Sequence, residues 1–149
     1  MLRRFSLLAL AAWNISAPAA EPPSAGRFDR VTIPPAKTSI YLGTVTMTMP
    51  DIVRRDGGYE SGYQARVFPY FFSNEQGRLR IEVSDEQLHQ LERGQPIHFK
   101  GRAVRADGAE RRIEGTATPA DPSGGRLKVR VFVARRIELI FNTTYRFEP

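Results

Sequence analysis

The sequence contains no cysteine, only two histidines and a single tryptophan in 149 residues. Without cysteine the chain has no disulfide bond, no thiol nucleophile and no thiolate ligand for a metal ion. His89 and His98 fall in different expected elements with no nucleophile motif beside them, so we predict structural roles for both. The composition therefore predicts neither a catalytic centre nor a bound metal or cofactor.

A long hydrophobic segment is also missing. The longest apolar run, Phe5–Trp13, is well short of the about 20 residues that a membrane-spanning helix needs. It follows Arg3 and Arg4 and precedes the small residues Ala17–Ala19, which is the order of a secretory signal peptide. We therefore expect residues 1–19 to be removed and the protein to be exported, periplasmic or extracellular, with no transmembrane segment in the mature chain.

Charge of one sign is not in large excess, with 22 lysines and arginines against 16 acidic residues. Two of these arginines belong to the expected signal peptide, so the mature chain is only modestly basic. Together with export, this makes nucleic acid an unexpected partner.

Prolines mark the expected start of the folded domain. Residues 20–37 contain two proline pairs and few apolar residues, which predicts an extended leader outside the core. The remaining residues, 38–149, have the length of one domain and suffice to bury a core.

Alternation of apolar and polar residues is the main pattern of this domain, and it is typical of half-buried strands. Residues 51–62 interrupt the pattern with three glycines and are predicted as a mobile connection. Turns are expected at 74–77, 107–108, 122–125 and 134–136. The predicted strands cover about residues 39–49, 63–72, 78–83, 97–103, 112–117, 126–133 and 137–145.

One short helix is predicted over about residues 85–93. Ser84 and Gln87 form a capping box, Leu88 and Leu91 lie one turn apart, and Gly94 is placed to end the helix. The predicted fold is all-β: a small antiparallel barrel or sandwich of about seven strands, with this helix inserted after the third. The order of three strands, a helix and a hairpin is OB-like, as an analogy of element order.

The segment from Arg66 to Phe72 gathers four aromatic residues around one proline. Pro69 cannot donate a ladder hydrogen bond, which places it at an edge or a bulge. Alternation makes both faces of the segment apolar, with Val67 and Phe71 on one side. We expect the protein's own helix or termini to cover Phe68, Tyr70 and Phe72; if they do not, this segment is the first candidate ligand site.

Basic residues spaced by two predict a positively charged outer face. Its members are Lys100, Arg102, Arg126, Lys128 and Arg130, with Arg78, Arg80, Arg111 and Arg112 nearby in the pattern. The alternative is a solvated face balanced by Glu82, Glu114 and Glu138, which protects the sheet from aggregation.

These observations predict an exported, non-enzymatic binding or accessory domain of the cell envelope that recognises an anionic glycan or lipid. One alternative is a structural or assembly protein that pairs through an edge strand or with itself. Another, less favoured, is a hydrolase of unrecognised type. The candidate ligand-binding residues are Arg66, Phe68, Tyr70, Phe72, Lys100, Arg102, Arg126, Lys128 and Arg130.

Overall fold

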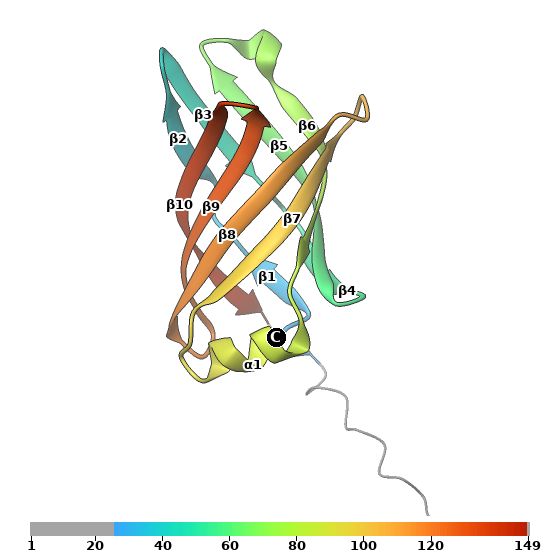
Figure 1. Ribbon diagram of the computed structural model, residues 1–149, viewed down its shortest axis with the longest axis vertical. Coiled ribbons are helices and arrows are strands. Elements are labelled where there is room, and N and C mark those ends of the chain that lie inside the picture. The colour runs from blue at the N-terminus through green and yellow to red at the C-terminus, as the bar shows by residue number, and fades with distance from the viewer. Residues whose placement is uncertain (1–25, 149) are drawn as a thin grey trace, which may run out of the picture.

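The computed structural model describes residues 26–148, so the predicted signal peptide lies outside the described part. Ten strands, one α-helix and one short 3-10 helix make up this described part of the chain (Figure 1). The strands are β1 (Arg30–Thr32), β2 (Ala36–Ile40), β3 (Gly43–Thr48), β4 (Ile52–Arg55), β5 (Gly58–Phe68), β6 (Glu75–Glu82), β7 (Ile97–Arg105), β8 (Glu110–Asp121), β9 (Gly124–Ala134) and β10 (Ile137–Glu148). The helices are η1 (Phe71–Ser73) and α1 (Asp85–Glu92).

The strands form a closed antiparallel barrel, which confirms the predicted fold class. From β5 to β10 each strand pairs with the next one along the chain, and β1 completes the barrel by pairing with both β10 and β4. The hairpin β2–β3 extends the wall, because β3 pairs with the second half of β5. The connectivity is thus an up-and-down meander, and the OB-like analogy is limited to the presence of strands before and after one helix.

The two ends of the barrel differ (Figure 1). At the helix end lie α1, the β4–β5 turn and both ends of the described chain. At the open end lie η1 and the turns β2–β3, β5–β6, β7–β8 and β9–β10. Within residues 26–148 no helix is long and apolar enough to cross a membrane.

The predicted leader is wrong from residue 26 onward. Phe28 is buried at the helix end, Ala36 is buried in β2, and β1 is the strand that closes the barrel. The prolines at 34 and 35 separate β1 from β2 instead of keeping the segment out of the sheet. The expected leader residues 20–25 lie outside the described chain.

Two further strand boundaries differ from the predicted ones. The expected strand 39–49 is divided by a turn at Tyr41 and Leu42, whose apolar side chains imitate strand alternation. The expected mobile connection 51–62 is instead the tight hairpin of β4 and β5. Asp56 and Gly57 form its turn with φ values of 46° and 76°, a conformation that glycine adopts without strain.

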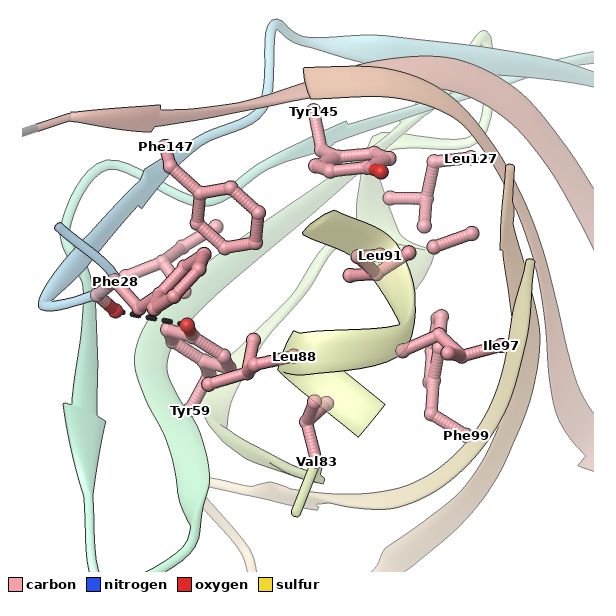
Figure 2. Packing of buried hydrophobic residues seen from close by; sticks show 12 residues of the cluster. Phe28, Tyr59, Val83, Leu88, Leu91, Ile97, Phe99, Leu127, Tyr145 and Phe147 are labelled. Carbon is pink, nitrogen blue, oxygen red and sulfur yellow. Dashed lines mark hydrogen bonds between the residues drawn. The ribbon is translucent and has the colours of Figure 1, made fainter. Parts of the chain in front are cut away.

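Helix α1 has the predicted bounds to within one residue and closes one end of the barrel. The Ser84 hydroxyl accepts a hydrogen bond from the Gln87 backbone N–H, and the Gln87 side chain accepts one from the Ser84 N–H, as in a capping box. Leu88 and Leu91 are buried against aromatic side chains from both ends of the chain (Figure 2). The helix therefore closes this end of the barrel with apolar side chains. We call the buried cluster around it the plug core: Phe28, Ile52, Tyr59, Val83, Leu88, Leu91, Ile97, Phe99, Ala117, Leu127, Tyr145 and Phe147.

The second apolar cluster fills the barrel towards the open end. Its buried members come from eight strands and include both small and large residues. Gly115 of β8 faces the ring of Phe99 in β7 so closely that a β-carbon at residue 115 would collide with that ring. The cluster consists of Ala36, Val45, Tyr63, Ala65, Leu79, Ala103, Ile113, Val131 and Phe141.

Candidate ligand site

The barrel interior contains a cavity of about 140 Å³. Side chains of both apolar clusters line it, and the few polar residues in the lining include Glu75, Arg111 and Thr143. Its volume resembles that of an engineered protein cavity of about 150 Å³ that binds benzene. The interior therefore has room for an apolar group of about six carbon atoms.

An ionic cluster lies on the inner wall near the open end. The Tyr63 hydroxyl donates a hydrogen bond of 2.7 Å to Oε1 of Glu75, and Nη2 of Arg111 donates one of 3.3 Å to Oε2. Nε of Arg105 lies 3.6 Å from the same Oε2. Glu75 begins β6 while Arg105 ends β7, so both lie at the open end of their strands. We call Tyr63, Glu75, Arg105 and Arg111 the mouth cluster.

Two guanidinium groups share the Glu75 carboxylate, and Nη2 of Arg105 also lies 3.4 Å from Oδ2 of Asp107, so the charges around the mouth cluster balance. Burial, reinforced by the hydrogen bond to Glu75, raises the pKa of Tyr63, so this hydroxyl remains a donor at neutral pH. Glu75 and Arg111 expose only 16% and 18% of their side chains. An anion that reaches Arg111 is therefore only weakly screened by water.

Arg111 has a hydrogen-bonding group that is not used within the described chain. Its Nη1 donates to the Val133 carbonyl oxygen over 2.7 Å, but its Nε is buried and has no partner. Buried polar groups in proteins are nearly always hydrogen-bonded, and the exceptions often mark the place of a water, an ion or a ligand. Arg111 is therefore the residue in the cavity wall best placed to bind an anionic group.

The predicted aromatic segment lies at the tip of the open end. Phe68 and Phe72 expose 61% and 87% of their surface, and Tyr70 is half-buried. The expectation that the protein's helix covers these residues is wrong, because α1 closes the opposite end (Figure 1). Phe71, which alternation placed on the inner side, is also 61% exposed, since η1 turns the chain away from the barrel wall.

The predicted basic residues lie on the outside of the barrel. Lys100, Arg102, Arg126, Lys128 and Arg130 are exposed on β7 and β9. Lys100 pairs across the strands with Glu82 and Glu114, and Glu114 in turn pairs with Arg130. This alternation of sign matches the glutamate-balanced alternative.

The structure does not gather the nine candidate residues into one site. Arg66 lies on β5 next to the aromatic segment, whereas β6 separates β5 from the basic strand β7. Arg80, considered part of the basic face, instead forms ion pairs of 2.9 Å with Glu60 and with Glu82. The ion pair between Arg80 of β6 and Glu60 of β5 links these two strands.

The sequence pattern contained one signal for the mouth cluster that the prediction did not use. Arg111 and Arg112 are adjacent in a strand, so they cannot share a face. Arg111 has the parity of the buried Ile113 and Ala117, which places it inside the barrel. By the same parity Glu75 belongs with Leu79, but the meeting of Glu75 with Arg111, 36 residues apart, depends on the barrel's closure.

Comparisons of the chain with protein-family models, with curated proteins and with solved structures give no significant match.

Proposed function

We propose that this protein is a non-enzymatic, exported binding protein for a small anionic amphiphile, with the anion at the mouth cluster and the apolar part in the barrel cavity. The observation that supports this best is Arg111, a largely buried guanidinium group whose Nε has no partner among the described residues, in the wall of a mostly apolar cavity. The sequence predicts either an anionic glycan or an anionic lipid as the ligand, and an apolar cavity with a cation in its wall favours the lipid. A glycan offers too little apolar surface to fill such a cavity.

The cavity volume sets the size of the proposed ligand. A chain or ring of about six carbons fills a space of this kind. Small ligands gain between about 0.3 and 1.5 kcal/mol per non-hydrogen atom. At about 0.6 kcal/mol for each of its roughly eight such atoms, hexanoate is expected to bind with a Kd of about 0.3 mM. Met47 and Met49 also line the cavity, and their flexible side chains allow it to adapt to a longer chain.

The first test compares Arg111→Met with Arg112→Met in hexanoate binding, measured by calorimetry or by NMR shifts. A hydrogen bond to a charged group contributes about 1.5–3 kcal/mol, so Arg111→Met is expected to weaken binding at least tenfold. Arg112 is the matched control, because it lies on the outer face with its guanidinium 4.0 Å from the Phe132 ring centre. Its replacement is expected to leave hexanoate binding unchanged.

A neutral probe separates the contribution of the ligand's charge to binding from the contribution of the cavity. The unchanged protein is expected to bind hexan-1-ol more weakly than hexanoate. The Arg111→Met variant is expected to bind hexan-1-ol as well as the unchanged protein does. If Arg111→Met does not fold, Glu75→Gln combined with Arg111→Met removes both charges of their ion pair and serves instead. Equal losses with Arg111→Met and Arg112→Met, or no hexanoate binding by the unchanged protein, would contradict the proposal.

A cavity-filling variant gives an independent prediction with opposite effects on stability and binding. Ala103 is buried and lines the cavity, so Ala103→Leu places three more carbons inside it. The ligand-free protein is expected to gain about 0.5–2 kcal/mol in its free energy of unfolding, as in other cavity-filling substitutions. Hexanoate binding is expected to be lost. Val104→Leu, at the adjacent outward-facing residue, is the control and should change neither stability nor hexanoate binding. Thermal unfolding measures the first and calorimetry the second.

A second candidate function, assembly through an edge strand, has one supporting observation. Residues 137–145 of β10 pair only with β9, although β2 lies beside them. No backbone hydrogen bonds of a sheet ladder join β2 to β10 here, so backbone groups of both strands are available to another strand. Assembly would be excluded if the protein binds hexanoate, remains a monomer at high concentration by light scattering, and retains no partner in a pull-down.

A further inference from the structure

Apart from Val104, which lies on the outer face of β7, the large exposed apolar side chains of residues 26–148 gather at the open end of the barrel. Three separate connections contribute them: the β2–β3 turn, the β5–β6 connection with η1, and the β9–β10 turn. Figure 1 shows these three connections as the tips of the barrel wall opposite α1. We call the group the apolar rim: Tyr41, Leu42, Phe68, Phe71, Phe72 and Ile137, exposed by 98%, 63%, 61%, 61%, 87% and 56%.

The largest part of the rim is held in a defined arrangement. Phe68 and Phe71 pack edge to face with ring centroids 5.8 Å apart, and Tyr70 and Phe72 do so at 5.9 Å. The side chain of Asn74 accepts a hydrogen bond of 2.8 Å from the Val67 backbone N–H, which ties the two ends of this connection together. Residues 69–74 contain no charged residue. The connection therefore presents ordered aromatic rings directly to the surroundings.

Basic residues accompany the rim. Arg135 and Arg136 form the β9–β10 turn directly before Ile137, and Arg66 precedes Phe68 by two residues. All three are exposed, and none forms an ion pair within 4.0 Å among residues 26–148. Basic side chains next to exposed aromatic rings are complementary to anionic headgroups above an apolar layer.

We propose that the open end of the barrel docks onto an anionic lipid surface, with the apolar rim inserted among the headgroups and acyl chains and Arg135 and Arg136 bound to the phosphates. Separate apolar tips around a mouth do not offer the continuous, complementary area that a stable protein interface needs. A fluid lipid layer accommodates each tip independently. The docking does not depend on the amphiphile site, but it places the mouth cluster next to the lipid.

The binding experiment uses sedimentation with vesicles of phosphatidylglycerol, and vesicles of phosphatidylcholine as the neutral comparison. The protein is recovered after export, and its mass identifies the processed chain, because an uncleaved apolar signal would itself bind lipid. Removal of residues 1–19 leaves all described residues in place. Phosphatidylglycerol vesicles are expected to bind the protein at least tenfold more tightly than phosphatidylcholine vesicles, and added salt is expected to reduce the difference.

Two double variants assign the binding to this end of the barrel. Phe71→Ser with Phe72→Ser is expected to weaken binding to both kinds of vesicle at least tenfold, while the exposed positions leave thermal stability unchanged. Arg135→Gln with Arg136→Gln is expected to weaken only phosphatidylglycerol binding, about tenfold. Arg126→Gln with Arg130→Gln is the matched control: it removes the same charge from the outer wall and is expected to have little effect.

A fluorescent reporter tests insertion directly. The only tryptophan of the sequence, Trp13, is removed with the signal peptide, so Phe72→Trp gives a single reporter on the rim. Its emission is expected to shift to shorter wavelength on phosphatidylglycerol vesicles, and an aqueous quencher should no longer reach it. An unshifted emission, an equal loss in the Arg126 and Arg130 control, or self-association through the rim that Phe71→Ser abolishes would each overturn the proposal.

Discussion

Replacement of Leu88 by alanine is expected to lower the free energy of unfolding by about 2–5 kcal/mol. Leu88 exposes only 2% of its surface and lies in the plug core, next to Tyr59 and Val83 (Figure 2). The loss combines the transfer energy of the removed carbons with the energy of the void that they leave. Because a small domain has only about 5–15 kcal/mol of net stability, this one change removes a large part of it.

Denaturant unfolding measures this effect, with His89→Ala as the control on the same helix. His89 is exposed and makes only a 3.7 Å contact with Glu92, so its replacement is expected to change the free energy of unfolding by less than about 0.5 kcal/mol. Equal effects of the two substitutions would mean that α1 is not packed into the barrel in solution.

Raising the pH above 10 is expected to unfold the barrel steeply. Burial raises the pKa of Tyr145 from 10.0 to about 12, and Asp121 adds to the shift. Burial also raises the pKa of Tyr59 and of Tyr63. A tyrosine with a raised pKa in the folded state stabilises the fold fully below its unfolded pKa and loses that contribution as the pH rises through the folded value.

The three buried tyrosines make the alkaline transition cooperative. Each one that must lose a proton on unfolding reduces stability by up to about 1.4 kcal/mol per pH unit above 10. Tyrosinate absorbance and circular dichroism, followed together, are expected to change in one transition between pH 10 and the folded pKa values. Tyr145→Phe retains the ring that packs 5.6 Å from Phe147 and should make the pH dependence shallower with little change at neutral pH. An unchanged pH dependence would show that Tyr145 is not buried as described.

The helix was predictable because its signals are local. Ser84, Gln87 and the leucine spacing act within eleven residues, and no distant contact overrides them. The number of strands was not, since Tyr41 and Leu42 continue an apolar alternation through a turn. Local pattern does not reveal that these two side chains point to the surroundings at the barrel's tip.

The candidate site was only partly predictable, for a similar reason. The aromatic segment around Phe72 was recognised from its composition, and the structure exposes it at one end. The mouth cluster depends on residues from β5, β6, β7 and β8 that meet inside a closed barrel. Parity places Arg111 inside, but only the register of β6, β7 and β8 places Glu75 beside it.

The two ends of the described part of the chain meet in the plug core, and this has a practical consequence. Phe28 and Phe147 pack edge to face with ring centroids 4.8 Å apart, so the chain enters and leaves the barrel at the same point. A tag or a fusion partner attached beyond either residue emerges beside α1, at the far end from the open mouth. A surface-tethered form of the protein, immobilised through either end, would therefore present the mouth cluster and the apolar rim outward.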